Sequence, residues 1–128
     1  MLTPKEIDSL SNFVKAHLDE YQSNFRDNIN IIKGYLTLHN SYNTLVTLKD
    51  NDKFIAITRF NIENDTAEVL DAIIDKDFRG KGLMREIAKI GHERFPYVKF
   101  IKFEGPFDAI MKTMPIEKYI GEKDEVNI

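Results

Sequence analysis

Apolar side chains recur every three or four positions in the first part of the chain, as on one face of an amphipathic helix. These positions are Ile7, Leu10, Val14, Leu18 and Tyr21. The residues before them are typical of a helix start, because Thr3 can cap, Pro4 suits the first helical position and Glu6 completes a capping box. The pattern therefore predicts a helix over residues 4–21.

A second helical pattern follows a polar stretch. Its apolar face is formed by Ile29, Ile32, Tyr35 and Leu36. Asp27 or Asn28 can cap this helix, and the polar residues 39–43 end it.

From residue 44 onward the pattern changes to short β-branched and aliphatic runs separated by polar turns. The runs cover residues 44–48, 54–60 and 66–74. Runs of this length and composition predict an antiparallel meander of three strands. The third run becomes wholly apolar at its end, as expected of a central strand.

Apolar positions return to helical spacing over residues 83–95, and Pro96 ends that helix. Residues 97–103 alternate at their end and predict another strand. Because strand, turn, helix and strand form a crossover unit, this strand should lie parallel to the third one. The remaining residues are expected to form a short helix at 106–114, an edge strand at 116–120 and a loose tail at 122–128.

Two glycines stand between the third strand and the following helix, and basic residues flank them. Gly80 and Gly82 alternate with Arg79 and Lys81. The free N–H groups and the dipole of a helix start favour an anion, and glycine lets the backbone approach it closely. This segment predicts a site for a phosphate-bearing ligand held mostly by backbone. An ordinary strand-to-helix turn with solvated basic side chains is the alternative.

The charge of the chain is uneven. The 128 residues carry a net charge of −3, but residues 76–102 hold eight basic and three acidic side chains, so this segment is +5 and the rest is −8. A local positive potential would attract an anionic ligand. The alternative is that the excess of basic residues arose by chance and that these side chains lie on exposed faces. The negative total argues against a general nucleic-acid binder.

Composition excludes several kinds of chemistry. The chain has no cysteine, which excludes disulfides, cysteine nucleophiles and thiolate metal sites and fits a cytoplasmic protein. Its three histidines lie far apart in the sequence, so no metal site is expected. The first residues do not resemble a signal peptide, and no apolar run is long enough to span a bilayer.

The order of elements and the glycine turn resemble the GNAT family of acetyl-coenzyme A-dependent N-acetyltransferases. The family signature, Gln/Arg-x-x-Gly-x-Gly/Ala, opens the helix that follows the fourth strand. The matching stretch here is Arg79-Gly80-Lys81-Gly82-Leu83-Met84, preceded by the apolar Ile74 and the aromatic Phe78.

The chain also departs from the family pattern. Met84 stands where the family has a small residue, and a bulky side chain there could crowd the ligand. No clear strand precedes the first helix, and the usual C-terminal Asn and Tyr motifs are missing. These departures bear on catalysis more than on the fold.

The resemblance implies a fold and a coenzyme site. The fold is α/β (α+β), a single domain over residues 1–128 with two N-terminal helices and a mixed sheet in which an antiparallel meander precedes a β-α-β crossover. Pantetheine would run along the strand that ends at Ile74. Pyrophosphate would be held by the amides of Arg79, Gly80, Lys81, Gly82, Leu83 and Met84.

The resemblance also indicates catalytic residues. Glu68 matches a carboxylate that histone acetyltransferases of this family use as a base. The alternative is that Glu68 is simply a polar residue near the start of a strand, without a catalytic role. Asp71 is a weaker candidate, because strand alternation places it on the opposite face from Glu68. Tyr119 is the candidate acid, or else an aromatic residue of an edge strand.

The function expected on this basis is transfer of acetyl from acetyl-coenzyme A to a primary amine by direct attack in a ternary complex, without a metal. The acceptor would be a small molecule or a protein amine. No nucleic acid or membrane partner is expected, and a homodimer is one alternative for the assembly. The rival functions are a non-catalytic GNAT-fold module that binds coenzyme A or a protein partner, and a nucleic-acid binder that uses residues 76–102.

Overall fold

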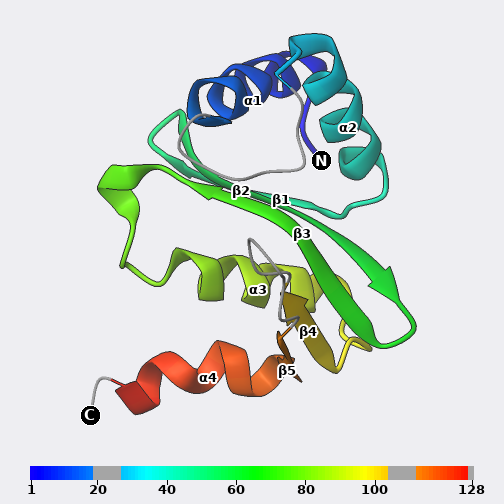
Figure 1. The fold of residues 1–128 in the computed structure, drawn as a ribbon, viewed down its shortest axis with the longest axis vertical. Coiled ribbons are helices and arrows are strands. Elements are labelled where there is room, and N and C mark those ends of the chain that lie inside the picture. The colour runs from blue at the N-terminus through cyan, green and yellow to red at the C-terminus, as the bar shows by residue number, and fades with distance from the viewer. Residues whose placement is uncertain (19–26, 104–111, 127–128) are drawn as a thin grey trace.

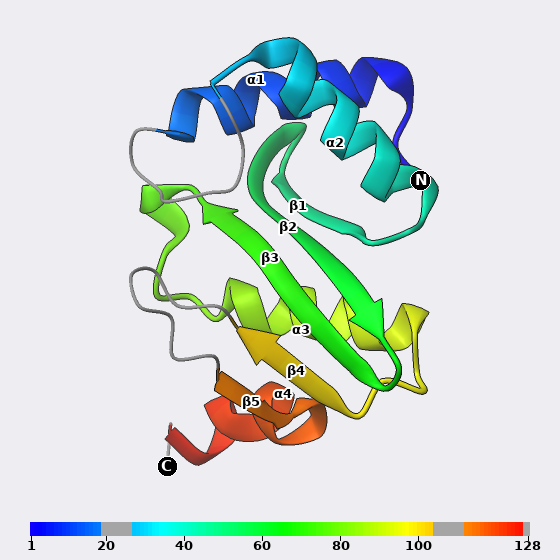
Figure 2. The same cartoon turned by 45° about the vertical axis from the view of Figure 1, so that its right-hand side comes forward.

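The computed structural model describes residues 1–18, 27–103 and 112–126, which form one sheet covered by helices on both faces (Figures 1 and 2). The sheet has five strands in the order β1-β2-β3-β4-β5. Helices α1 and α2 lie on one face, and α3 and α4 lie on the other (Figure 1). The elements are α1 (Pro4–His17), α2 (Ile29–Ser41), β1 (Leu45–Asp50), β2 (Lys53–Glu63), β3 (Thr66–Ile74), the 3-10 turn η2 (Lys76–Phe78), α3 (Leu83–Arg94), β4 (Phe100–Phe103), β5 (Lys112–Pro115) and α4 (Ile116–Val126).

Side chains next to the first two helices fix where they begin. The capping box of α1 is present, with reciprocal hydrogen bonds between Thr3 and Glu6. Asn28, rather than Asp27, caps α2 by accepting from the amides of Asn30 and Ile31. The predicted helix starts are therefore confirmed. The last predicted residues of the first helix, 19–21, lie outside the described residues.

The predicted meander and crossover are confirmed. β2 pairs antiparallel with β1 and β3, and β4 pairs parallel with β3. Asn51 and Asn64 adopt φ of 55° and 56° in the two hairpin turns, a conformation that asparagine tolerates. β4 is shorter than predicted, because residues 95–98 form a turn in which the Val98 amide donates to the Phe95 carbonyl.

The C-terminal predictions were wrong where the structure describes them. Residues 112–115 form β5 instead of the end of a helix, and α4 replaces the predicted edge strand and most of the tail. Ile116, Tyr119 and Ile120 have helical spacing and pack on the same core. Pro115 precedes this helix, and such a position suits proline. Residues 104–111 of the other predicted helix lie outside the described residues.

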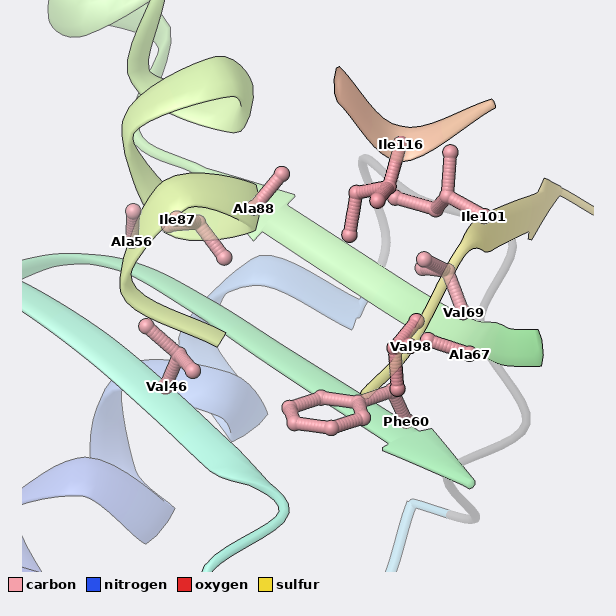
Figure 3. Close-up of a cluster of buried hydrophobic side chains, with 10 residues drawn as sticks. All are labelled: Val46, Ala56, Phe60, Ala67, Val69, Ile87, Ala88, Val98, Ile101 and Ile116. Atoms are coloured by element: carbon pink, nitrogen blue, oxygen red, sulfur yellow. The ribbon is translucent and has the colours of Figure 1, made fainter. Parts of the chain in front are cut away.

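Two hydrophobic cores flank the sheet. The first joins it to α1 and α2, through Ile7, Leu10, Val14, Ile32, Leu36, Leu45, Phe54, Ile57 and Ile73. The second joins it to α3 and α4 (Figure 3), through Val46, Ala56, Phe60, Ala67, Val69, Ile87, Ala88, Val98, Ile101 and Ile116. Among the described residues, no helix is both long enough and apolar enough to cross a membrane.

A β-bulge in β3 exchanges the two faces of that strand. Arg59 pairs with Asp71 and the next β2 residue, Phe60, pairs with Val69, so Leu70 is an extra residue. In an unbroken strand, residues an even number of positions apart face the same side of the sheet. Ile73 nevertheless packs in the first core and Val69 in the second.

The bulge corrects one prediction from the sequence. Asp71 faces the α1–α2 side with Ile73, and Glu68, which alternates with Val69, faces that side too. Strand alternation had placed Glu68 and Asp71 on opposite faces, because it assumed an unbroken strand. The described β3–β4 pairs, from Thr66–Phe100 to Val69–Phe103, all lie on the N-terminal side of Leu70 in β3.

Candidate active site

The glycine turn, residues 79–84, presents a row of backbone amides at the start of α3. Gly80 and Gly82 both have φ of 75°, in the left-handed region that favours glycine. Gly82 caps α3 without a side-chain hydrogen bond. Among the described residues, no acceptor binds the amides of Gly80, Lys81, Gly82, Leu83 and Met84. Amides arranged in this way suit an anion.

Asp75 holds the beginning of this segment in place. Its amide donates to the Ile55 carbonyl at 2.8 Å, and its Oδ1 accepts from the Asp77 amide at 2.9 Å. Its Oδ2 lies 3.6 Å from His17 Nε2 of α1. The Asp77 hydrogen bond, together with the charges of His17 and Lys53, lowers the pKa of Asp75. Our reading of the sequence missed this residue, although Asp before a turn is a common cap.

Met84 turns away from the glycine turn. Its side chain is half-buried and packs against the second core, and its sulfur accepts from Thr58 Oγ1 at 3.6 Å. Thr58 is a fully buried residue of β2 beneath α3. The side chain at this unusual position therefore points into the protein.

The two basic side chains of the glycine turn, Arg79 and Lys81, make different contacts. Arg79 Nε donates to the Ile74 carbonyl at 3.3 Å, which ties the turn to the end of β3. Lys81 Nζ lies 5.2 Å from the centre of the Phe78 ring, and the lysine is exposed. The positive charge of Lys81 is thus at the surface, next to the amides.

Glu68 lies on the opposite side of the bulge from the glycine turn and lines a groove. It is half-buried, and its register neighbours are Asn61 of β2 and Lys102 of β4. The next pair along the strands, Val69 with Phe103, is the last β3–β4 pair among the described residues. The groove is lined by Glu63, Asn64, Asp65, Thr66, Glu68, Lys102 and Thr113.

Tyr119 lies in α4, on the other face of the sheet. Its ring is 5.1 Å from that of Phe103, and the Arg85 guanidinium lies 5.7 Å from it. Arg85 belongs to the first turns of α3. The structure therefore brings Tyr119 near the start of α3 and does not bring it onto the face of Glu68.

Comparison with known proteins identifies the family. The profile of the Acetyltransferase (GNAT) family matches residues 7–91, which is more than half of the chain. The chain belongs to the GNAT acetyltransferase family. No match was found among curated proteins.

Solved structures share the GNAT fold at low sequence identity. An N-acetyltransferase from Staphylococcus aureus Mu50 has a TM-score of 0.63 at 10% identity, over 98% of this chain and 79% of that one. A ribosomal-protein-alanine N-acetyltransferase from Brucella melitensis has a TM-score of 0.59 at 11% identity, over 80% of this chain and 70% of that one. A variant of spermidine N-acetyltransferase from Vibrio cholerae has a TM-score of 0.56 at 15% identity, over 97% of this chain and 75% of that one.

A buried ion pair lies beside the bulge of this GNAT protein, on the same face as Glu68. Arg59 Nε lies 3.2 Å from both carboxylate oxygens of Asp71, and a terminal guanidinium nitrogen also donates to Oδ2. The two residues are only 4% and 8% exposed. Burial raises the pKa of Asp71, and the hydrogen bonds and charge of Arg59 act in the opposite direction.

Two residues of α2 lie near this pair. The ring of Tyr35 lies 5.2 Å from the Arg59 guanidinium carbon. His39 Nδ1 lies 2.8 Å from Thr44 Oγ1, and burial, together with the charge of Arg59, lowers the pKa of His39. Our reading of the sequence did not single out Arg59. Only the register of β2 against β3 brings it to Asp71.

No group of three or more His, Cys, Asp or Glu side chains suited to a metal ion occurs within residues 1–18, 27–103 and 112–126. The acetyl group and the amine can react without one, since the needed groups are a base and hydrogen-bond donors.

Proposed function

We propose that the protein transfers an acetyl group from acetyl-coenzyme A to a primary amine. The observation that carries this proposal is the position of the glycine turn. Its five available amides follow the end of β3, the central strand that pairs with β2 and β4. A diphosphate on the amides would leave the rest of the coenzyme to follow β3 toward Glu68.

The glycine turn would hold the pyrophosphate through the amides of residues 79–84. Hydrogen bonds to a charged group contribute roughly 1.5–3 kcal/mol each, so a few of them suffice for useful affinity. Lys81 would add its surface charge, and Arg79 would keep the turn attached to Ile74. Met84 contributes its amide while its side chain stays in the core.

The reaction would be a direct attack in a ternary complex. The amine nitrogen forms a bond to the thioester carbonyl carbon, the carbon–sulfur bond breaks, and coenzyme A leaves as a thiolate. A backbone N–H of β3 near the bulge would stabilise the oxyanion of the intermediate. Pantetheine would lie along the part of β3 that ends at Ile74.

Glu68 is the proposed base. The amine must be neutral to attack, so its proton has to move to a carboxylate, directly or through a water molecule. Glu68 is accessible in the groove and lies two residues before the bulge residue Leu70. Tyr119 is the proposed acid for the thiolate, on the strength of its place beside Arg85 in α3.

The acceptor class remains broad in this proposal. One structural neighbour is named for the alanine of a ribosomal protein and another for spermidine, so a peptide N-terminus and a polyamine are the first acceptors to test. A panel that includes a peptide beginning with alanine, spermidine and a lysine-containing peptide covers these chemistries. Release of free thiol reports each reaction.

A non-catalytic coenzyme-binding module is the second candidate. The observation that favours it is the separation of Glu68 and Tyr119 onto opposite faces of the sheet. If this alternative holds, acetyl-coenzyme A binds but no amine of the panel yields thiol.

Thermal denaturation with increasing acetyl-coenzyme A tests both candidates. A ligand that binds only the folded state raises stability by RT ln(1 + [L]/Kd), about 2.7 kcal/mol at 100 times Kd. We expect a concentration-dependent rise in Tm and thiol release with at least one amine. A constant Tm at high ligand would contradict both candidates.

A further inference from the structure

The Arg59–Asp71 pair lies at the register position next to the bulge. It is the last β2–β3 pair before the extra residue Leu70, and Phe60–Val69 is the first pair after it. We propose that this ion pair fixes the position of the bulge, and thereby the direction of Glu68. The inference rests on the proposed function for its catalytic consequence only.

Apolar packing alone leaves the position of the bulge poorly specified. The residues around it in β3 are Val69, Leu70, Ala72, Ile73 and Ile74, all apolar, and both faces of the sheet here are covered by cores. Because all of these side chains are apolar, polarity does not assign any of them to one core rather than the other. A shift of one residue in a strand moves its side chains to the opposite faces.

Asp71 is the one charged residue in this part of β3, and it removes the ambiguity. A buried carboxylate is strongly unfavourable unless it is paired and hydrogen-bonded. In the observed register Asp71 meets the Arg59 guanidinium at both oxygens. If the extra residue lay on the other side of Asp71, the carboxylate would turn toward the apolar second core.

The environment of Arg59 fits this role. The guanidinium is buried beneath the ring of Tyr35 from α2, so the pair connects the helix layer to β3. An arginine with a bidentate carboxylate is also more directional than a lysine. These contacts hold Asp71 on the α1–α2 side.

The consequence for the active site comes through Glu68. Without the bulge between Glu68 and Asp71, alternation from Asp71 would aim Glu68 at the second core instead of at the groove. Arg59 and Asp71 are thus positioning residues, which act through Glu68.

The decisive variant is the double replacement Arg59→Met with Asp71→Leu. Buried ion pairs can often be exchanged for apolar residues without loss of stability, so we expect a folded protein with Tm close to wild type. A misplaced base should lower kcat roughly 10- to 100-fold. The KM for acetyl-coenzyme A should change less than about twofold, since the glycine turn is untouched.

A second readout is independent of catalysis. Amide hydrogen exchange of residues 66–74, measured by NMR without ligand, should become faster in the double variant because the bulge is no longer confined to one position. Asp71→Asn should produce a weaker version of both effects. Asp8→Asn is the matched control, because it breaks the exposed Lys33–Asp8 pair, a 2.6 Å contact between α1 and α2 that does not involve β3.

The two readouts separate the two proposals. Wild-type exchange and kcat in the double variant would overturn the positioning role. If the wild-type protein shows no acetyl transfer, the proposed function fails, and the exchange rates alone decide whether the pair fixes the bulge. Faster exchange in Asp71→Asn supports the role even if the double variant does not fold.

Discussion

The two halves of the candidate site differ in how they are built. The glycine turn at the start of α3 is made of backbone amides, and its side chains are Lys81 at the surface and Met84 in the core. The groove around Glu68 is made of side chains from β2, β3, β4 and β5. One half is a local feature of the chain, and the other exists only where distant strands meet.

This difference predicts that the two halves will respond differently to substitution. A backbone site needs glycine at the positions with positive φ and is otherwise nearly indifferent to the side chains, provided that they point away. A side-chain site needs its residues on the correct face, and one extra residue in β3 decides that face. Changes in the glycine turn should therefore affect binding, and changes near Glu68 should affect turnover.

The largest effect is expected from Gly82→Asp. A carboxylate at this position places a negative charge where the pyrophosphate would lie, and the loss of two charge-assisted hydrogen bonds weakens binding roughly 100-fold or more. Calorimetric titration with acetyl-coenzyme A measures the change in Kd.

Two controls isolate the cause of that loss. Gly34→Asp adds the same charge to the exposed face of α2, where a Cβ meets no atom within 4 Å, and should leave Kd unchanged. Gly82→Asn keeps the size without the charge, and asparagine tolerates the left-handed conformation. Unchanged affinity in Gly82→Asp would remove the glycine turn from the coenzyme site.

The next effect concerns turnover. Glu68→Gln removes the proposed base and should lower kcat about 100-fold or more, because general base catalysis typically contributes 10²–10⁴-fold. The Kd of acetyl-coenzyme A should stay the same, since the proposed pyrophosphate site is at the other end of β3. Glu63→Gln, a neighbouring carboxylate of the groove, is the matched control. Equal kcat in Glu68→Gln and wild type would exclude Glu68 as the base.

Met84→Ala tests whether this residue belongs to the core or to the ligand site. Truncation of a half-buried methionine should lower the free energy of unfolding by about 1–3 kcal/mol, less than for a fully buried side chain. The Kd should change little, because the side chain contacts Thr58 and not the open side of the turn. Urea denaturation and calorimetric titration measure the two quantities. A much tighter Kd with unchanged stability would mean that Met84 obstructs the ligand.

The smallest effect is a pH dependence from His39. Its folded-state pKa is lowered from the ordinary 6.5 by burial and by Arg59, so below that value the unfolded state binds more protons. Stability is therefore present above about pH 6.5 and is lost as the pH falls toward the lowered pKa. Tm measured from roughly pH 7.5 to 5.5 should fall more steeply for wild type than for His39→Gln. Parallel curves would contradict the lowered pKa.

Local features of the chain were predictable, and features that depend on contacts were not. The capping box of α1, the boundaries of β3 and the start of α3 each depend on residues close in sequence, and all three agree with the structure. The strand and tail predicted after Pro115 failed, because three apolar positions with helical spacing were read as a strand. Short apolar runs are ambiguous in this way until it is known what they pack against.

The same distinction between local features and features that depend on distant contacts holds for the candidate site. The sequence alone determined a basic glycine turn between a strand and a helix, because φ preference and helix-start amides are properties of the local chain. The direction of Met84, the bulge at Leu70 and the pairing of Arg59 with Asp71 were decided by tertiary structure. Each of these depends on the fit of residues distant in sequence, and a one-residue change of register would alter it.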